Sequence, residues 1–213
     1  MELLSSVEED RDSRLTRQDW VLTALNVFLQ EGIGSVQITK LAEDLGVTRG
    51  SFYWHFKSRK QLLDAIVAEW RIRNTDIMVQ ALSRARTVEQ GILELFYIWV
   101  DHSKFSPQLD QAMRDWGRIS PEISTLVQSE DDSRVAAIAA FFRDQNYEET
   151  EAFIRARVTY FTQLSYYALG VEESTEQRMA YLETYVDCFT GQKISDVAAD
   201  EFRRRMISGQ ASR

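Results

Sequence analysis

Hydrophobic residues recur at helical spacing along most of the chain, and runs of β-branched residues are few. The first clear stripe runs from Val21 to Leu29 and ends at Gly32. Only two prolines and nine glycines occur in 213 residues, so little in the sequence interrupts helices. The pattern predicts an all-α fold.

Short polar signals mark where the predicted helices begin. Capping pairs, in which Ser or Thr is followed three residues later by Asp or Gln, start at Thr16, Ser58, Thr87 and Ser174. Ser-Pro steps open two further helices, because proline is well tolerated at the first helical position. Outside the turn region described next, we expect helices over 16–31, 58–79, 87–103, 106–117, 120–146, 148–170, 174–191 and 195–207, the last packing loosely or not at all.

Residues 36–62 predict two short helices around a tight turn. The first has one apolar face and ends at Gly46, where glycine readily supplies the left-handed backbone of a helix end. Thr48 can cap the second helix, whose Phe52 and Phe56 point inward together at i and i+4. Polar and aromatic residues remain on its other faces. This is the form of a helix-turn-helix that offers its second helix to a DNA major groove.

Charge supports this interpretation locally. The whole chain carries a formal net charge of −8, which argues against nucleic-acid binding, but residues 46–60 hold four basic and no acidic side chains. We therefore expect DNA affinity to depend on this patch and to weaken steeply with salt. The candidate DNA-binding residues are Thr39, Arg49, Gly50, Ser51, Tyr53, Trp54, His55, Lys57, Arg59 and Lys60.

The expected roles differ along the second helix. Arg49 and Ser51 lie on its first turn and are candidate base readers, although Arg49 could instead contact phosphate alone. Tyr53 and His55 can donate to phosphate oxygens, with packing between helices as the alternative for both. Trp54 could meet a thymine methyl group or lean on the following helix. For the basic residues at the start of the next helix, the helix N-terminus favours phosphate, and a purely solubilising role is the alternative.

The sequence gives little support for an enzyme or for a membrane protein. Neither His55 nor His102 has a glutamate three residues before it, and no zinc spacing, phosphate-binding glycine loop or nucleophile elbow occurs. We predict no enzyme activity, no metal and no cofactor. A lone Cys188 fits a reducing cytoplasm, and no apolar run is long enough to span a bilayer. The acidic residues 1–15 are expected to be a disordered arm.

Several short motifs occur in one register along residues 16–70: Gly32-Ile33, Lys40-Leu41-Ala42, Leu45-Gly46-Val47, the run from Ser51 to Phe56, and Lys57 with Leu62-Leu63. Through these motifs the segment Thr16–Trp70, about a quarter of the chain, resembles the N-terminal domain of the tetracycline-repressor (TetR) family. It departs from the common pattern at Gln37, Gly50 and Trp54, which bears on base preference. The resemblance implies a helix-turn-helix domain over 16–61 and a ligand-binding and dimerisation domain over 62–213, and it implies a phosphate contact for Tyr53.

The two helices over 148–170 and 174–191 carry apolar residues on more than one face, which indicates burial against a second copy of the chain. The candidate dimer-interface residues are Leu164, Tyr167, Ala168, Tyr181, Tyr185 and Phe189. A second set combines bulky apolar side chains with a few polar groups, as small-molecule pockets do, with plain core packing as the alternative. The candidate effector-pocket residues are Phe96, Trp99, His102, Met113, Trp116, Tyr160 and Gln163.

Together these features predict a homodimeric regulator of transcription in the cytoplasm, most simply a repressor that binds a palindromic double-stranded DNA operator and is released by a small-molecule effector. Ligand binding would tilt the long helix that begins at Ser58 and would move the paired recognition helices off their half-sites. Two alternatives remain open at this point. One is a DNA-binding regulator without an effector, and the other is a helical adaptor that has lost operator binding.

Overall fold

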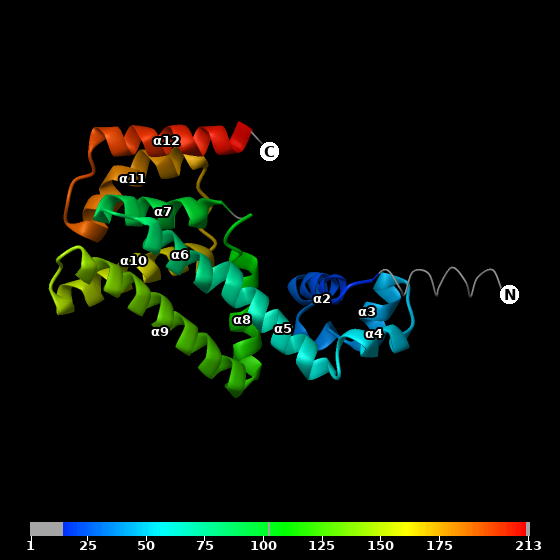
Figure 1. Ribbon diagram of the computed structural model, residues 1–213. Coiled ribbons are helices and arrows are strands. Elements are labelled where there is room, and N and C mark those ends of the chain that lie inside the picture. The colour runs from blue at the N-terminus through cyan, green and yellow to red at the C-terminus, as the bar shows by residue number, and fades with distance from the viewer. Residues whose placement is uncertain (1–14, 102, 212–213) are drawn as a thin grey trace. The chain divides into compact units, whose positions relative to one another are not determined.

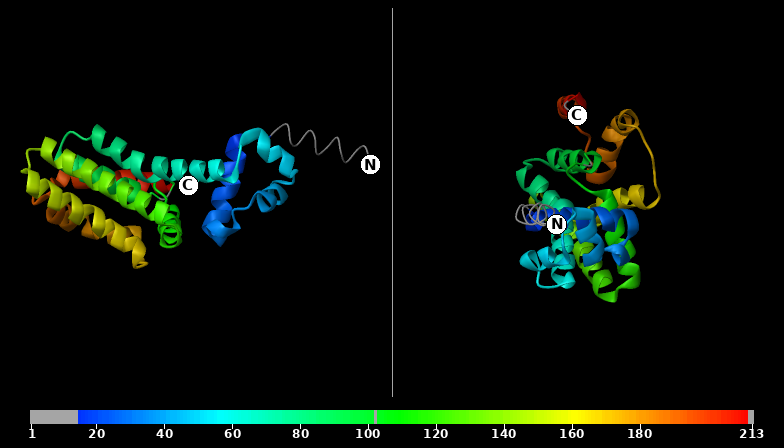
Figure 2. Two further views of the ribbon diagram at one scale, coloured as in Figure 1. Left: turned by 90° about the horizontal axis from the view of Figure 1, so that it is seen from below. Right: turned by 90° about the vertical axis from the view of Figure 1, so that its right-hand side faces the viewer.

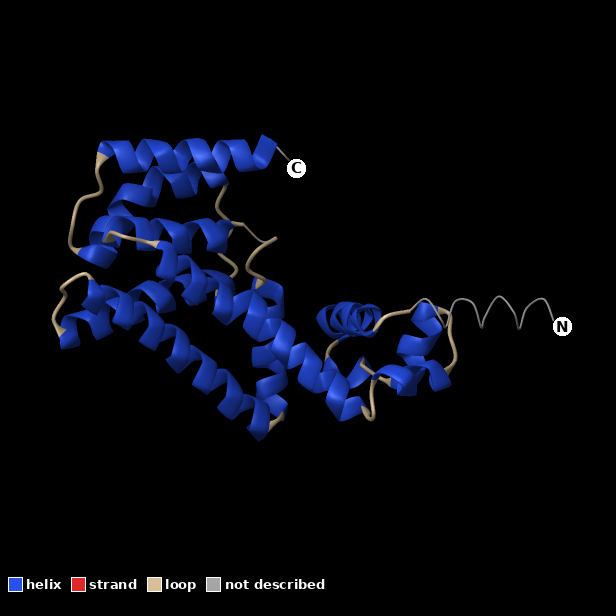
Figure 3. Ribbon diagram, viewed as in Figure 1, coloured by secondary structure: helices blue, strands red, loops and turns tan. Residues whose placement is uncertain are grey.

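Every regular secondary-structure element in the part that the structure describes is a helix (Figure 3), which confirms the all-α prediction. This computed structural model describes residues 15–101 and 103–211, with side chains up to residue 206, so most of the predicted arm and His102 lie outside the described residues. None of these helices combines the length and the apolar character needed to cross a bilayer. The elements are α2 (Arg17–Glu31), η1 (Ile33–Ser35), α3 (Ile38–Leu45), α4 (Arg49–His55), α5 (Arg59–Arg71), η2 (Ile72–Asp76), α6 (Ile77–Arg84), α7 (Val88–Val100), α8 (Pro107–Ile119), α9 (Pro121–Asp144), α10 (Glu149–Ala168), α11 (Thr175–Thr190) and α12 (Asp196–Ala211).

The chain divides into two compact units. The first contains residues up to Arg71 together with Gln108–Ser124, and the second contains Ile72–Pro107 and Thr125–Arg213. In the first unit α2 packs on α3 and α5 (Figure 1). The rings of Trp20 and Phe52 meet edge to face, with centroids 5.3 Å apart. This division does not follow the expected boundary after residue 61, because α5 belongs to the first unit as far as its last residue.

Helix α8 also belongs to the first unit. Its buried Asp110 accepts a hydrogen bond of 2.9 Å from the indole Nε1 of Trp70 on α5. The ring of Trp116 meets Phe28 of α2 edge to face, with centroids 5.8 Å apart. Within α8 itself, Arg114 and Asp110 form a partly buried ion pair at 3.0 Å. The contacts with Trp70 and Phe28 tie α8 to α5 and α2.

The second unit is built around α7. Helices α11 and α12 pack against α7 and against each other, and Figures 1 and 2 show the three lying side by side. Ile92 of α7, Phe142 of α9 and Val186 of α11 are fully buried in the same core. Phe202 and Met206 of α12 are buried there too, so the prediction that the last helix packs loosely was wrong. Their spacing of four residues places both side chains on one face.

The long helix expected over 58–79 is interrupted by the π-helical turn η2. Two polar residues of this turn are buried. Asn74 donates to the carbonyl oxygen of Ser106 at 2.9 Å, and Thr75 donates to a carboxylate oxygen of Glu130, also at 2.9 Å. Both partners lie far away in the sequence, and π turns arise where such side-chain contacts compete with regular helix packing. The helix then resumes as α6 and continues to Arg84.

A buried arginine extends this polar cluster. Arg134 of α9 is 0% exposed, and its Nε donates to the hydroxyl oxygen of Thr75 at 2.9 Å. Its Nη1 donates to the hydroxyl oxygen of Tyr160 on α10 at 2.8 Å, and that hydroxyl donates in turn to Asp131 at 2.5 Å. Buried charges need such partners, because an unpaired charge in the interior is costly. The cluster therefore joins η2, α9 and α10 inside the second unit.

Candidate nucleic-acid interface and ligand pocket

The turn between α3 and α4 has the backbone expected of a helix-turn-helix. Gly46 ends α3 in the left-handed region, with φ 68° and ψ 37°, and its N–H donates to carbonyl oxygens of the last turn of α3. A residue with a Cβ would be strained here. Thr48 precedes α4 with an extended backbone, although its side chain makes no capping hydrogen bond, unlike the prediction. The amide of Ser51 donates to the carbonyl oxygen of Thr48 instead, at 3.1 Å.

Two phenylalanines fix which face of α4 points outward. Phe52 and Phe56 are buried and stack on each other with ring centroids 5.4 Å apart. Their burial leaves Arg49, Tyr53 and Trp54 exposed, as predicted, and Trp54 is the extreme case with 87% of its side chain in solvent. An aromatic side chain this exposed gains nothing from the fold itself. The outer face of α4 thus presents a cation, a phenol and an indole together.

The other predicted DNA-binding residues in this region differ in how far their side chains are exposed to solvent. Gly50 and Thr39 are exposed, and His55 is half-buried. Hydrogen bonds from Thr16 lower the pKa of the Asp19 carboxyl group on α2, and the nearby His55 lowers it further. Ser51 is buried and its hydroxyl has no hydrogen-bond partner. The assignment of Ser51 as a base reader therefore needs correction, because its side chain points into the domain beside Phe52.

Arg59 also departs from its predicted role. Its Nε donates to the carbonyl oxygen of Val36 at 2.6 Å, and its Nη2 donates to the carbonyl oxygen of Ile33 at 3.0 Å. Both bonds are partly buried, so the guanidinium group holds the connection between α2 and α3 against the start of α5. The expected phosphate contact is corrected to a structural one. These acceptors lie more than twenty residues away along the chain, so a local sequence signal could not reveal them.

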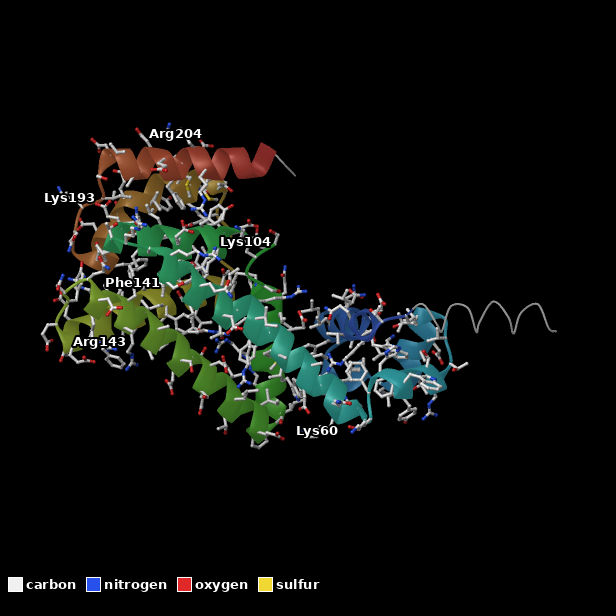
Figure 4. All side chains as sticks on the ribbon, viewed as in Figure 1. Lys60, Lys104, Phe141, Arg143, Lys193 and Arg204 are labelled. Atoms are coloured by element: carbon white, nitrogen blue, oxygen red, sulfur yellow. The ribbon has the colours of Figure 1, made fainter. Side chains whose placement is uncertain are left out.

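The remaining cations at the start of α5 differ in how accessible they are to a DNA phosphate. Lys57 is exposed, and its backbone N–H donates to Oε1 of Gln61 at 2.7 Å. Lys60, labelled in Figure 4, pairs with Asp64 at 3.0 Å on an exposed face, and this hydrogen bond raises the pKa of the lysine. Arg17 of α2 was not among the predicted contacts. Its guanidinium group lies over the ring of Phe56, 4.6 Å from the centroid, which places a further exposed cation beside the end of α4.

The second unit contains a narrow pocket among α7, α10 and α11. Its volume is about 20 Å³, enough for about one water molecule. Of the predicted pocket residues, Phe96, Trp99 and Gln163 line it together. The sequence missed the other aromatic walls, Tyr166 among them. The remaining lining residues are Val100, Thr159, Thr162, Glu173, Arg178, Tyr185 and Phe189.

Three of the other predicted pocket residues lie elsewhere. Met113 and Trp116 belong to α8 in the first unit, where Met113 is fully buried. Tyr160 points away from the pocket into the polar cluster around Arg134. His102 lies outside the described residues. The assignments of Met113, Trp116 and Tyr160 are corrected, because helix order along the chain does not fix which helices share a core.

The predicted interface residues separate in a similar way. Tyr181 and Ala168 are exposed, while Leu164 and Tyr167 are half-buried against the core of the second unit. The side chains of Tyr185 and Phe189 line the pocket, and Phe189 is only 4% exposed, so their assignment to an outward surface is corrected. A different apolar face is open on α10. It consists of Phe153, Ile154, Val158 and Phe161, each 41–52% exposed.

Comparison with known proteins agrees with this geometry. Residues 21–66 match the family model described as bacterial regulatory proteins, tetR family. A curated relative, the HTH-type transcriptional repressor BepR of Brucella suis biovar 1 (strain 1330), is 30% identical over 125 residues, which cover 55% of this chain and 60% of BepR. The chain thus spans less than two thirds of the length of this relative.

Solved structures extend the likeness to the whole fold. Salmonella enterica GusR is similar with a TM-score of 0.64 at 16% identity, covering 82% of this chain and 93% of GusR. A SmeT–triclosan complex is similar with a TM-score of 0.63 at 18% identity, covering 85% of this chain and 93% of SmeT. The helix-turn-helix of the first unit, the family model matched by residues 21–66 and the shared all-helical fold together indicate a bacterial regulatory protein of the TetR family.

Proposed function

We propose that this protein is a transcriptional regulator that binds a palindromic DNA operator as a homodimer and acts as a repressor. The outer face of α4 carries the proposal, because Arg49, Tyr53 and Trp54 are exposed together on a helix whose inner face is fixed by buried phenylalanines. A helix of this kind enters the major groove with its first turns near the base edges. Lys57 and Arg17 supply exposed cations beside it for the phosphates.

The open face of α10 supports the proposal of a two-fold partner. Four large apolar side chains on one helix face are more than scattered surface residues, and a second copy would bury them symmetrically. The guanidinium group of Arg157 lies over the rings of Phe153 and Phe161, at 5.5 and 5.2 Å, and could stay at the rim of such an interface. We propose this face, with Tyr181 of α11, as the dimer contact. Pairing through it would present two recognition helices to one operator.

Release by a small molecule is the second part of the proposal. The pocket among α7, α10 and α11 is the proposed effector site, and BepR, the relative described above, is named a repressor. The polar cluster around Arg134 joins α10, which carries part of the pocket wall, to η2, which directly follows α5 in the chain. A ligand that favours one arrangement of α10 would thereby bias the helix that follows the recognition helix. Typical couplings change affinity by about 5- to 150-fold.

Measuring duplex binding directly tests the proposal. Arg49→Ala and Tyr53→Phe should each weaken binding of the dimer to a selected duplex by roughly thirtyfold, since each removes a contact worth about 1 kcal/mol from both protomers. Lys193→Ala is the matched control, because it removes an exposed positive charge from the second unit (Figure 4) and should leave affinity unchanged. An adaptor without operator binding would show no salt-dependent duplex binding in any of the four proteins. A regulator without an effector would bind DNA but respond to no pocket ligand.

A further inference from the structure

Unpartnered polar atoms gather around the pocket of the second unit. The indole Nε1 of Trp99, the hydroxyl of Thr159 and the amide Nε2 of Gln163 are buried without a hydrogen-bond partner, and all three residues are at least nine-tenths buried. The Oε2 atom of Glu173, which is half-buried at the rim, is also without a partner. All four residues line this one pocket. Buried polar atoms are normally satisfied, so their concentration here indicates a site built for a polar guest.

Leaving these buried polar atoms without hydrogen-bond partners costs free energy. Each unpaired buried donor or acceptor loses its hydration without a replacement, and this penalty is commonly about 1–3 kcal/mol. A cavity of about 20 Å³ admits about one water molecule. A ligand that supplies matching groups at several points would recover more of this penalty than a single water. The pocket is therefore closed to large molecules as it stands but favourable for a small one that can open its rim.

The walls determine the shape of that ligand. The ring of Phe189 stacks on Phe96 with centroids 6.0 Å apart, and Tyr185 lies 5.5 Å from Phe189 at a tilt of 32°. All three rings line the pocket, and a planar aromatic ligand can stack against a ring face that is turned to it. Tyr185 is half-buried, so rotation of its side chain could widen the entrance without disturbing the deeper floor. Phe189 belongs to that buried floor.

The polar atoms determine the substituents. Trp99 can only donate and Gln163 presents its unpaired amide donor, so the buried end of the pocket requires an acceptor oxygen on the ligand. The free oxygen of Glu173 can only accept when ionised, so the rim requires a donor there. Burial and the hydrogen bond to Tyr185 raise the pKa of Tyr166, and the negative charge of Glu173 adds to this shift. Glu173 and Tyr166 line the same pocket, which places the carboxylate at its rim.

We propose, on the basis of the effector site assigned above, that the ligand is a small planar aromatic molecule with an acceptor oxygen at one end and an amine or hydroxyl donor at the other. The acceptor lies between Trp99 and Gln163, and the donor lies against Glu173. The guanidinium group of Arg178 lies over the ring of Tyr166, 5.3 Å from its centroid, at the rim. A ligand with an ammonium donor gains the charge of Glu173, and a ligand with a carboxylate in that place is repelled by it.

Four matched probes test this assignment by calorimetric titration of the full chain. Tyramine carries a phenol oxygen and an ammonium group, tyrosol replaces the ammonium by a hydroxyl, phenethylamine lacks the phenol oxygen, and para-hydroxyphenylacetate carries a carboxylate. Tyramine and tyrosol should bind. Phenethylamine should bind about tenfold more weakly than tyramine, because it leaves the buried donors unpaired. The carboxylate probe should bind at least about tenfold more weakly than tyramine, because it meets Glu173.

Two substitutions assign the ends of the ligand. Gln163→Met conserves volume and should weaken tyramine about tenfold while leaving phenethylamine unchanged. Glu173→Gln should weaken tyramine about tenfold or more and leave tyrosol nearly unchanged. Gln128→Met on the exposed surface of α9 is the control and should alter neither probe. If Gln163→Met does not fold, as judged by circular dichroism, the affinities of tyramine and phenethylamine for the parent chain still show whether an acceptor oxygen binds at the buried end of the pocket.

The inference is overturned if phenethylamine matches tyramine, if the carboxylate probe binds tightest, or if none of the four binds at millimolar concentration. Duplex binding, measured separately by fluorescence anisotropy, keeps this result apart from the proposed function. Duplex binding without probe binding would leave the regulator proposal intact and refute the ligand class. Probe binding in the predicted order without duplex binding would support the ligand class and refute DNA regulation.

Discussion

Arg59 and Lys57 are both cations at the start of α5, but replacing them should have different effects. Replacing Arg59 should lower stability, and replacing Lys57 should weaken DNA binding. The structure assigns the guanidinium group of Arg59 to two backbone carbonyls of the connection between α2 and α3, at 2.6 and 3.0 Å. Lys57 is exposed, and its side chain is open to phosphate. Methionine at either position keeps an unbranched side chain and removes the charge. The pair is therefore matched in chemistry and differs only in what the cation contacts.

The expected magnitudes follow from these contacts. Hydrogen bonds to a charged group contribute about 1.5–3 kcal/mol each when buried, and partial solvent exposure reduces this value. Arg59→Met should lower the free energy of unfolding by about 2 kcal/mol, or the melting temperature by about 4–8 °C for a chain of this size. Lys57→Met should change stability by less than about 0.5 kcal/mol. Thermal melts followed by circular dichroism measure both effects.

The salt dependence of DNA binding gives the second readout. Each phosphate contact contributes about −0.9 to the slope of log affinity against log salt concentration. Lys57→Met removes one contact in each protomer of a dimer, so the slope should flatten by about 1.8. Arg59→Met should leave the slope unchanged. If Arg59→Met instead flattened the slope and left the melting temperature unchanged, its guanidinium group would contact phosphate and our assignment would be refuted.

Three further substitutions test the packing. Gly91→Ala places a Cβ about 2.2 Å from the ring of Phe141 (Figure 4) and should lower the free energy of unfolding by about 1–2 kcal/mol, a loss that Phe141→Leu in the same chain should relieve. Arg134→Met should cost about 3 kcal/mol in urea unfolding, because it strands buried polar partners, and a loss below about 1 kcal/mol would contradict the cluster. Hydrogen bonds from Thr16 lower the pKa of the Asp19 carboxyl group, so its stabilisation is present above its ordinary pKa of 3.8 and is lost as the pH falls through the lowered value. Asp19→Asn should therefore be less stable than the parent at pH 7, and the two proteins should converge in acid.

Helix starts could be predicted because their signals are local. The capping boxes at Thr16 and Ser174 are present as expected, and Thr87 and Ser58 accept from the amides three residues on. Each of these contacts spans three residues, so the sequence contains both partners within one turn. The same locality explains why Gly46 was correctly placed at the helix end.

Features that depend on distant partners could not be predicted in this way. The π turn η2 is held by side-chain bonds to residues more than thirty positions away, and the role of Arg59 depends on carbonyls twenty-three and twenty-six positions away. The inward orientation of Tyr185 and Phe189 is set by how α11 rotates against α7 and α10. An apolar residue on a helix with two apolar faces has no local signal that tells core from interface. The sequence pattern identified a helix with two apolar faces, but it did not show which face points outward.

Selection of bound fragments from random duplex DNA tests the central claim most directly, because it asks whether the exposed face of α4 reads sequence. The parent chain should enrich an inverted repeat whose half-sites lie about one helical turn apart, or a multiple of that spacing, centre to centre. Arg49→Ala should lose the preference at one position of each half-site while it retains weaker, salt-dependent binding. Recovery of no common sequence, or of the same sequence with equal strength by Arg49→Ala and the parent, would contradict the account.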